Sequence, residues 1–210
     1  MDLQPAEQRR RRQRSEARRT ILDAAEEILL EDGDHRLSIR GLVSRCGYTA
    51  PTIYHYFSDK AGLVDALLEE RFSKLLRRLR RAPQHADPAE NLRELTLALV
   101  RFGLRNPSHY RLLMTPRGDG REPPQAAEEV FALFEKPLER LAEAGRLIAE
   151  DPEAARQSAW AMMHGLIDLQ SSRPDLPWSK SLSSVGVDTL LRGLVLSQPA
   201  PRGRRSNAQS

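Results

Sequence analysis

The chain has 210 residues, of which 40% are hydrophobic, with a formal net charge of +4 and a single cysteine. This length allows one large or two small domains with a sizeable core. A single cysteine excludes a disulfide framework and a cysteine-based zinc site, and no stretch approaches the roughly 20 apolar residues of a membrane span. No apolar segment follows the basic residues 9–12, so no signal peptide is visible. We therefore expect a cytoplasmic protein.

The charges are distributed unevenly along the chain. Arginine dominates the first twenty residues and recurs at Arg36, Arg40 and Arg45, whereas acidic residues gather between Glu122 and Glu153. A basic end beside a more acidic body indicates that only one end of the chain meets an anionic polymer. The alternative is a basic surface that serves only solubility.

The first fourteen residues are polar and rich in arginine, and we expect them to be disordered without DNA. Two interpretations of this arm stay open. It adds phosphate contacts or enters a minor groove, or it is a solubilising tail. A first helix is expected from Ser15 to Leu30, because apolar residues recur there at helical spacing: Ile21, Ala24, Ala25, Ile28 and Leu29.

Two short helical patterns follow between residues 38 and 60. Ser38 stands in the capping position of the first, and Gly47 can take the left-handed conformation that ends a helix. Thr49 can cap the second pattern, and Pro51 suits its first turn. This spacing is typical of a helix-turn-helix, whose second helix enters the major groove of DNA.

Polar and aromatic side chains are dense on the second helix. Threonine can contact base edges or phosphates, and tyrosine and histidine donate to phosphate oxygens. Lys60 lies where the helix dipole disfavours a cation, but a phosphate backbone would favour it. The candidate DNA contacts are Ser38, Arg40, Thr49, Ala50, Pro51, Thr52, Tyr54, His55, Tyr56 and Lys60. Ile53 and Phe57 are expected in the core.

The run TIYHYFSDKAGLVDALLE, residues 52–69, resembles the recognition-helix signature of the TetR family of bacterial repressors. The likeness begins near Arg18 and covers about the first third of the chain. The family often has Tyr-Tyr-His-Phe where this chain has Tyr54 to Phe57, so individual phosphate contacts transfer less directly than the family does. The resemblance implies an all-α fold, with an N-terminal three-helix helix-turn-helix DNA-binding domain and a C-terminal helical ligand-binding and dimerisation domain. It also implies contacts between the DNA backbone and the residues Arg18, Arg19 and Thr20.

Apolar periodicity predicts further helices over residues 59–81, 89–104, 125–149, 153–169 and 182–196, and a shorter one from Asn106. Pro137 should kink or split the 125–149 helix. Residues 115–124 are expected to be a mobile loop. The predicted organisation is a disordered arm over 1–14, a DNA-binding domain over 15–60, a ligand and dimerisation domain over 61–197, and a disordered tail over 198–210.

The runs AWAMMHGLIDL and NPSHYRLLM resemble the Trp-His-Gly type of TetR-family C-terminal domain. The apolar faces of helices 153–169 and 182–196 predict a homodimer through a four-helix bundle. The candidate ligand pocket is mostly apolar with a few polar groups, as ligand pockets tend to be, although an ordinary helical core has the same composition. Its residues are Phe102, Tyr110, Met114, Phe131, Phe134, Trp160, Met163 and His164.

An enzyme is a poor fit to this sequence. It has no glycine-rich phosphate loop and no nucleophile elbow, and His109 and His164 lack carboxylates at metal-ligand spacing. We expect no cofactor and no metal. The resemblance to the TetR family implies a regulator that binds a palindromic operator as a homodimer, represses transcription, and is released by a small molecule. The alternatives are a ligand-binding helical module with a vestigial DNA head and a non-specific DNA-binding protein.

Overall fold

A computed structural model of the chain describes residues 5–32, 36–115, 120–148 and 151–196. Within these ranges the chain forms nine helices and no strand, apart from an isolated antiparallel bridge between Leu147 and Val195. In the same part of the chain, no helix combines the length and the apolarity that a membrane crossing requires. The predicted all-α fold is confirmed.

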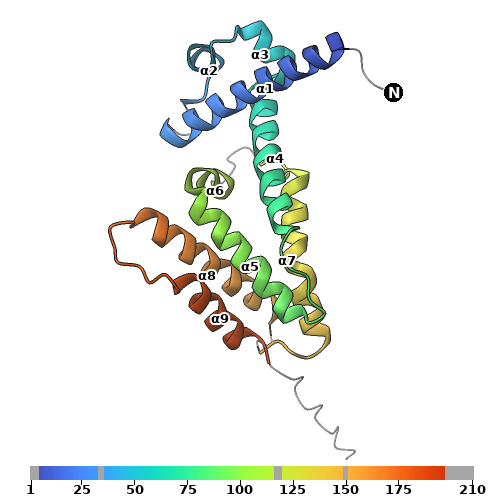
Figure 1. Ribbon diagram of the computed structural model, residues 1–210, viewed down its shortest axis with the longest axis vertical. Helices are drawn as coiled ribbons and strands as arrows, with labels where there is room; N and C mark the ends of the chain where they lie inside the picture. The colour runs from blue at the N-terminus through green and yellow to red at the C-terminus, as the bar shows by residue number, and fades with distance from the viewer. Residues whose placement is uncertain (1–4, 33–35, 116–119, 149–150, 197–210) are drawn as a thin grey trace, which may run out of the picture. The chain divides into compact units, whose positions relative to one another are not determined.

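The helices follow one another as α1 (Pro5–Asp32), α2 (Ile39–Cys46), α3 (Ala50–Phe57), α4 (Lys60–Leu79), α5 (Pro88–Arg105), α6 (Pro107–Met114), α7 (Gln125–Glu143), α8 (Pro152–Ser172) and α9 (Leu182–Leu194) (Figure 1). They form two compact units. The N-terminal unit comprises residues 1–74 and 106–128, and the C-terminal unit comprises residues 75–105 and 129–210. This division differs from the predicted boundary at residue 60, because α6 packs against α1 and Arg71 of α4 pairs with Glu26 of α1.

Helix α1 corrects one prediction. Residues 5–14 are not disordered but form the first turns of α1, which runs without a break to Asp32. Glutamine and arginine are good helix formers, and Glu7 in the first turn suits the helix dipole. A low hydrophobic content therefore did not imply disorder here. Residues 1–4 and the predicted disordered tail from residue 198 lie outside the described residues.

Helix α7 is shorter than predicted and is not split by Pro137, which lies inside the single helix. The helix ends at Glu143 because Gly145 has a φ of 64°, the left-handed conformation that glycine adopts readily. The backbone N–H groups of Gly145 and Arg146 donate to the carbonyls of Ala142 and Leu141 at 2.9 and 2.8 Å. This is the Schellman pattern of helix termination, and it was the stop signal that apolar periodicity alone overlooked.

The N-terminal unit has a charged cluster inside its core. Arg71 of α4 is only 1% exposed, and its Nε donates to Oε2 of Glu26 on α1 at 2.8 Å. It also pairs with Asp23 and Glu70. The imidazole Nε2 of His109 on α6 lies 3.4 Å from Oε1 of Glu26. Because buried charges need several partners, this cluster holds α1, α4 and α6 in one arrangement.

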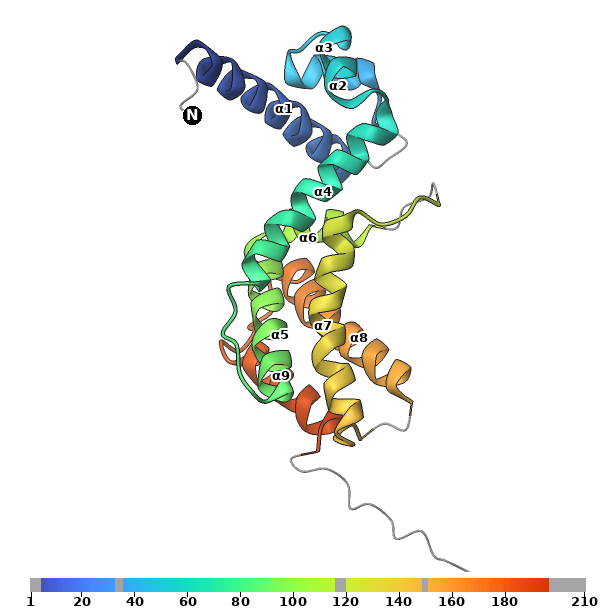
Figure 2. The same cartoon turned by 90° about the vertical axis from the view of Figure 1, so that its right-hand side faces the viewer.

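The C-terminal unit has an apolar core contributed by α5, α7, α8 and α9. Its most buried members are leucine and alanine side chains, namely Leu92, Leu138, Leu141, Ala155, Ala159, Leu190 and Leu194. Figure 2 shows these helices running alongside one another. The paired chain segments after α7 and after α9 are joined by backbone hydrogen bonds, including Leu196 N–H to the Arg146 carbonyl at 2.7 Å.

Candidate DNA-binding site and effector cavity

The turn between α2 and α3 is built by local hydrogen bonds. The Ser38 hydroxyl accepts from the Gly41 N–H at 3.1 Å and caps α2. Gly47 has a φ of 73° and ends that helix. The Thr49 hydroxyl accepts from the Thr52 N–H and caps α3, with Pro51 in the first turn. These capping predictions are confirmed, and together they set the angle between the two helices of a helix-turn-helix.

Helix α3 has one buried and one exposed side. Ile53 and Phe57 are 1% and 5% exposed and belong to the core, as predicted. Tyr54 is 49% exposed, and Pro51 and His55 are also exposed. A phenol ring that leaves half its surface in water in an otherwise packed unit is available to a partner.

The other candidate DNA contacts lie around this exposed side. Ala50, Thr52, Tyr56 and Lys60 are half-buried, whereas Ser38, Arg40 and Thr49 are exposed. The hydroxyls of Thr49 and Thr52 lie 2.9 Å apart and share a hydrogen bond. Helix α4 begins at Lys60, and the Asp59 carboxylate accepts from the Gly62 N–H at 2.7 Å. The ten candidates therefore fall on α2, on α3, on the residues Ser38 and Thr49 that cap these helices, and on the first residue of α4.

Two arginines of the basic region are engaged inside the protein. Arg45 donates to Glu27 and Glu31 of α1 at 3.2 and 2.8 Å, which lowers the pKa of the Glu31 carboxyl. Arg18 lies 3.3 Å from Glu70, with its guanidinium 5.5 Å from the centre of the Phe57 ring. Their contribution to the basic charge is thus partly neutralised within the N-terminal unit.

An apolar cavity of about 30 Å³ lies within the C-terminal unit. Since one water needs about 10–15 Å³ by this measure, the cavity holds no more than a few waters. Trp160 of α8 closes one side and is 37% exposed, with its ring 5.4 Å from Phe131 and 4.2 Å from His164. Burial lowers the pKa of His164, against the raising effect of Asp168.

The cavity gathers half of the predicted ligand residues. Phe131, Phe134, Trp160 and Met163 line it, together with five residues that were not predicted: Leu92, Glu135, Leu138, Arg156 and Ala159. Aliphatic residues on α5 and α7 gave no signal that separates a cavity wall from a core. Of the remaining predicted residues, Phe102 is half-buried on α5 and His164 contacts Trp160. Tyr110 and Met114 lie on α6 in the N-terminal unit.

Comparison with known proteins decides the family. The profile described as "Bacterial regulatory proteins, tetR family" matches residues 21–67, and the profile described as "Tetracyclin repressor-like, C-terminal domain" matches residues 92–184. The chain belongs to the TetR family of transcriptional regulators. The Trp-His-Gly subgroup of C-terminal domains stays a prediction.

The proteins to which this TetR-family chain is similar include one named an activator and, by fold, one named a repressor. The HTH-type transcriptional activator FasR of Mycolicibacterium smegmatis is 27% identical over 185 residues, which cover 87% of this chain and 81% of FasR. A TetR-family regulator from Marinobacter aquaeolei has the same fold, with a TM-score of 0.73 at 16% identity over 88% of this chain and 98% of that chain. NalD, described as the secondary repressor of a multidrug efflux pump in Pseudomonas aeruginosa, has a TM-score of 0.60 at 23% identity over 88% of this chain and 98% of its own.

The C-terminal unit of this TetR-family member also has a wider cavity, of about 430 Å³. Its wall is charged, and two of its arginines are paired with carboxylates of the same wall. Arg93 donates to Asp188 at 2.7 Å, and Arg146 donates to Asp87 at 2.7 Å, which lowers the pKa of both carboxyl groups. Because these guanidinium groups are already bound, the cavity offers less to a ligand than its volume suggests.

Large apolar side chains are exposed on α8 and α9. Met162 and Leu169, seven residues apart on α8, are 41% and 55% exposed, and Val185 of α9 is 57% exposed. Seven residues make two helical turns, so the two α8 side chains lie on one face. Ala161 is exposed near this face and Gly165 is half-buried. The packed face of α8 lies elsewhere on the helix, at Ala155, Ala159, Met163 and Ile167.

Proposed function

We propose that this TetR-family regulator is a homodimeric repressor that binds a palindromic operator through α3 and releases it when a small molecule enters the C-terminal unit. The observation that carries this proposal is the exposed side of α3 in a capped helix-turn-helix. Pro51, Tyr54 and His55 are exposed there, while Ile53 and Phe57 anchor the helix to the core. A recognition helix needs this division, because its outer side must reach base edges and phosphates.

The exposed apolar faces of α8 and α9 support a homodimer. An apolar face on two helices in one chain pairs with its copy across a two-fold axis, which forms a four-helix bundle. Leu169 and Val185 would become buried in that pairing. Two copies of α3 would then read successive major grooves, about 34–36 Å apart, and the operator would be palindromic.

The small volume of the apolar cavity supports release by an effector. A cavity of about 30 Å³ is far below the roughly 300–1,000 Å³ of ligand pockets. An effector therefore binds only a conformation in which Trp160 or the phenylalanines of α7 have moved. By linkage, a ligand that prefers that conformation weakens DNA binding by the same factor by which DNA weakens its own binding.

Repression is proposed ahead of activation. The proposed mechanism needs only occupancy of the operator, whereas activation needs a further contact with the transcription machinery. FasR is named an activator and NalD a repressor, so relatives occur on both sides of this choice. The alternative of a ligand-binding module whose helix-turn-helix no longer binds DNA is disfavoured, because candidate DNA contacts are present at Arg40, Thr52, Tyr54 and Lys60.

The test is fluorescence anisotropy of the full chain on DNA from upstream of its own gene, against a scrambled duplex at two salt concentrations. We expect a preference of about 10³ or more. Arg40→Ala or Thr52→Ala should cost about 1–3 kcal/mol and relax specificity, while Lys60→Ala should weaken both duplexes alike and flatten the salt dependence.

Two results would contradict the proposal. Equal binding to both duplexes, repeated on a genome-wide footprint, would indicate a non-specific DNA-binding protein. Equal losses on operator and scrambled DNA for all three variants would exclude base reading by Arg40 and Thr52. A reporter gene whose transcription rises on deletion of the regulator supports repression, whereas a fall would indicate activation.

A further inference from the structure

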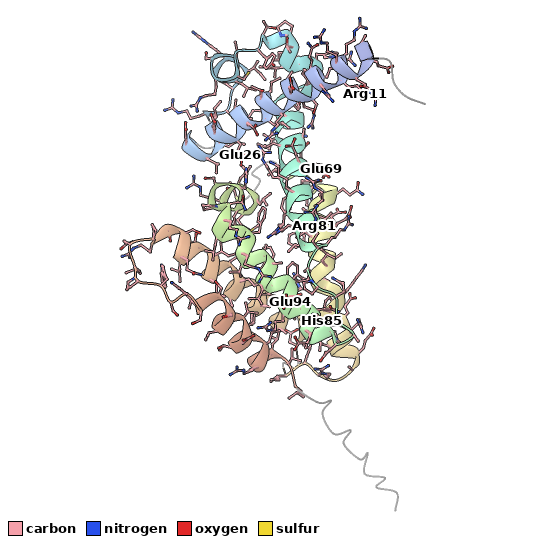
Figure 3. All side chains as sticks on the ribbon, viewed as in Figure 1. Arg11, Glu26, Glu69, Arg81, His85 and Glu94 are labelled. Carbon is pink, nitrogen blue, oxygen red and sulfur yellow. The ribbon has the colours of Figure 1, made fainter. Side chains whose placement is uncertain are left out.

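The first three turns of α1 form an exposed basic helix. Arginines occupy positions 9, 10, 11, 12 and 14, and every residue from Ala6 to Glu16 is exposed. Ala17 is the first buried residue of the helix, at 8% exposure. None of these five arginines forms an ion pair with another residue in the described ranges. Figure 3 shows Arg11 near the free end of this helix, beyond the packed part of the N-terminal unit.

The face that packs against the core in the rest of α1 is continued by arginine. Ile28, Ile21 and Ala17 follow one another on that face at intervals of seven and four residues and are buried. The same spacing leads to Arg14 and Arg10, three and seven residues before Ala17. A helix extended only to add solubility needs no such orientation, whereas a charged inner face suits an anionic surface placed beside the unit.

The extension is unfavourable as an isolated helix. Four consecutive cations near the N-terminus oppose the helix dipole, and Arg10 and Arg14 are like charges at i and i+4, which repel each other. Phosphates would relieve both effects. The ten residues from Pro5 to Arg14 span about 15 Å at 1.5 Å per residue, or four to five base pairs at about 3.4 Å each.

The extension and the recognition helix both lie in the upper part of the N-terminal unit as drawn in Figures 1 and 2. Figure 2 shows the start of α1 on the opposite side of that unit from α3, so a contact made by the extension would fall outside the bases that α3 reads. As a helix with a diameter of about 10–12 Å, the extension does not fit a minor groove about 6 Å wide. It can lie along the phosphate backbone.

We propose that residues 5–14 are a helical DNA contact that binds phosphates of the duplex outside the half-site read by α3, with Arg10 and Arg14 toward the DNA. This proposal rests on the proposed function, since it requires a specific operator from which the outside can be defined. The proposed contact adds a flank of four to five base pairs to the bound DNA, and in this flank the protein contacts phosphates but no base edges.

The experiment compares two charge-matched variants of the full chain. Arg10→Gln with Arg14→Gln removes the inner pair, and Arg9→Gln with Arg12→Gln removes the same charge from other faces of the same helix. Glutamine keeps the helix propensity. Each protein is titrated by anisotropy, from about 50 to 200 mM salt, on the operator with flanks of about ten base pairs and on the operator without flanks.

We expect the inner pair to reduce the slope of log K against log salt by about 0.9 per lost phosphate contact. That is about four for a homodimer, or a fall in affinity across the salt range that is smaller by about 100-fold. The control pair should change the slope by less than about one. On the operator without flanks, the wild-type chain and the inner-pair variant should show the same slope of log K against log salt.

Equal changes in the two variants would show a general attraction between charges and would overturn the contact. So would unchanged slopes, or a difference that survives removal of the flanks. The failure of the proposed function looks different, because the wild-type chain would then bind operator and scrambled duplex alike, and the flank contact would fall with it. Specific binding with unchanged slopes overturns the flank contact alone.

Discussion

The interiors of the two units are stabilised by different interactions. The N-terminal unit holds a buried guanidinium, Arg71, among carboxylates from α1 and α4. The C-terminal unit has a leucine and alanine core and leaves three further large apolar side chains, Met162, Leu169 and Val185, exposed on α8 and α9. An ionic cluster tolerates few arrangements, whereas an apolar core tolerates repacking.

This difference matches the two tasks proposed for the units. A helix that reads base edges must be held in one position, so a geometrically demanding interior is useful in the N-terminal unit. An effector cavity that opens from about 30 Å³ requires side chains that can repack, which an apolar interior allows. The following predictions test whether the contrast between the two units is real.

The largest expected effect is the loss of the buried guanidinium. Arg71→Met keeps much of the side-chain volume but leaves Glu26, which is 7% exposed, without its main partner. The free energy of unfolding should fall by about 3–5 kcal/mol. Urea denaturation at pH 7 and fixed protein concentration measures this loss of stability.

Arg93→Met is the control in the C-terminal unit. Its side chain and that of Asp188 are 31% and 32% exposed, so the loss should stay near 0–1 kcal/mol. Equal losses would contradict the contrast.

The second effect concerns the exposed apolar faces. Leu169→Asp or Val185→Asp would place a charge in the centre of the proposed dimer interface, where its desolvation is uncompensated. We expect the dissociation constant of the dimer to rise by about 100-fold or more, which is about 2.7 kcal/mol, as measured by analytical ultracentrifugation. Ile148→Asp is the matched control, because Ile148 is 47% exposed but lies outside α8 and α9. A dimer that persists in the first two variants, or one that is lost only in the control, would place the interface elsewhere.

The smallest expected effect is a dependence of the free energy of unfolding on pH, to which one histidine in each unit contributes. Burial lowers the pKa of His109 below its usual 6.5, helped by Arg71 and Lys74 and opposed by Glu26 and Asp23. Between that lowered value and 6.5 the unfolded chain binds more protons, so stability falls as the pH falls through this window. Burial gives His164 the same sign.

Denaturation curves between pH 7.5 and pH 5 test this prediction. His109→Gln and His164→Gln should each flatten part of the decline, and the double variant should flatten more of it. A decline that is unchanged in the double variant would assign the acid sensitivity to carboxylates instead.

The helix-turn-helix could be predicted from the sequence because its signals are local. Ser38, Gly47 and Thr49 each act within a few residues, so their conformations follow from residue type and position. The ionic cluster could not be predicted, since Glu26, Arg71 and His109 lie on three helices far apart in the chain. Charges on a predicted helix look like a solvated face until its packing is known.

The cavity and the start of α1 show two other limits. Aliphatic residues such as Leu92 and Leu138 have the same pattern in a core and in a cavity wall, and only packing separates them. For residues 5–14 the composition indicated disorder, but the first helix continued through them. The composition of a segment indicates whether the segment can be buried. A helical segment that continues a packed helix can form without being buried.

The bridge between Leu147 and Val195 has a mechanical consequence. It is reinforced by hydrogen bonds from Ile148 N–H to the Leu194 carbonyl and from Arg146 Nε to the Leu196 carbonyl, at 2.9 and 3.1 Å. Helices α8 and α9 therefore form one loop that is fastened at its base. Any repacking of α8 and α9 therefore takes place between two chain ends that these hydrogen bonds hold together.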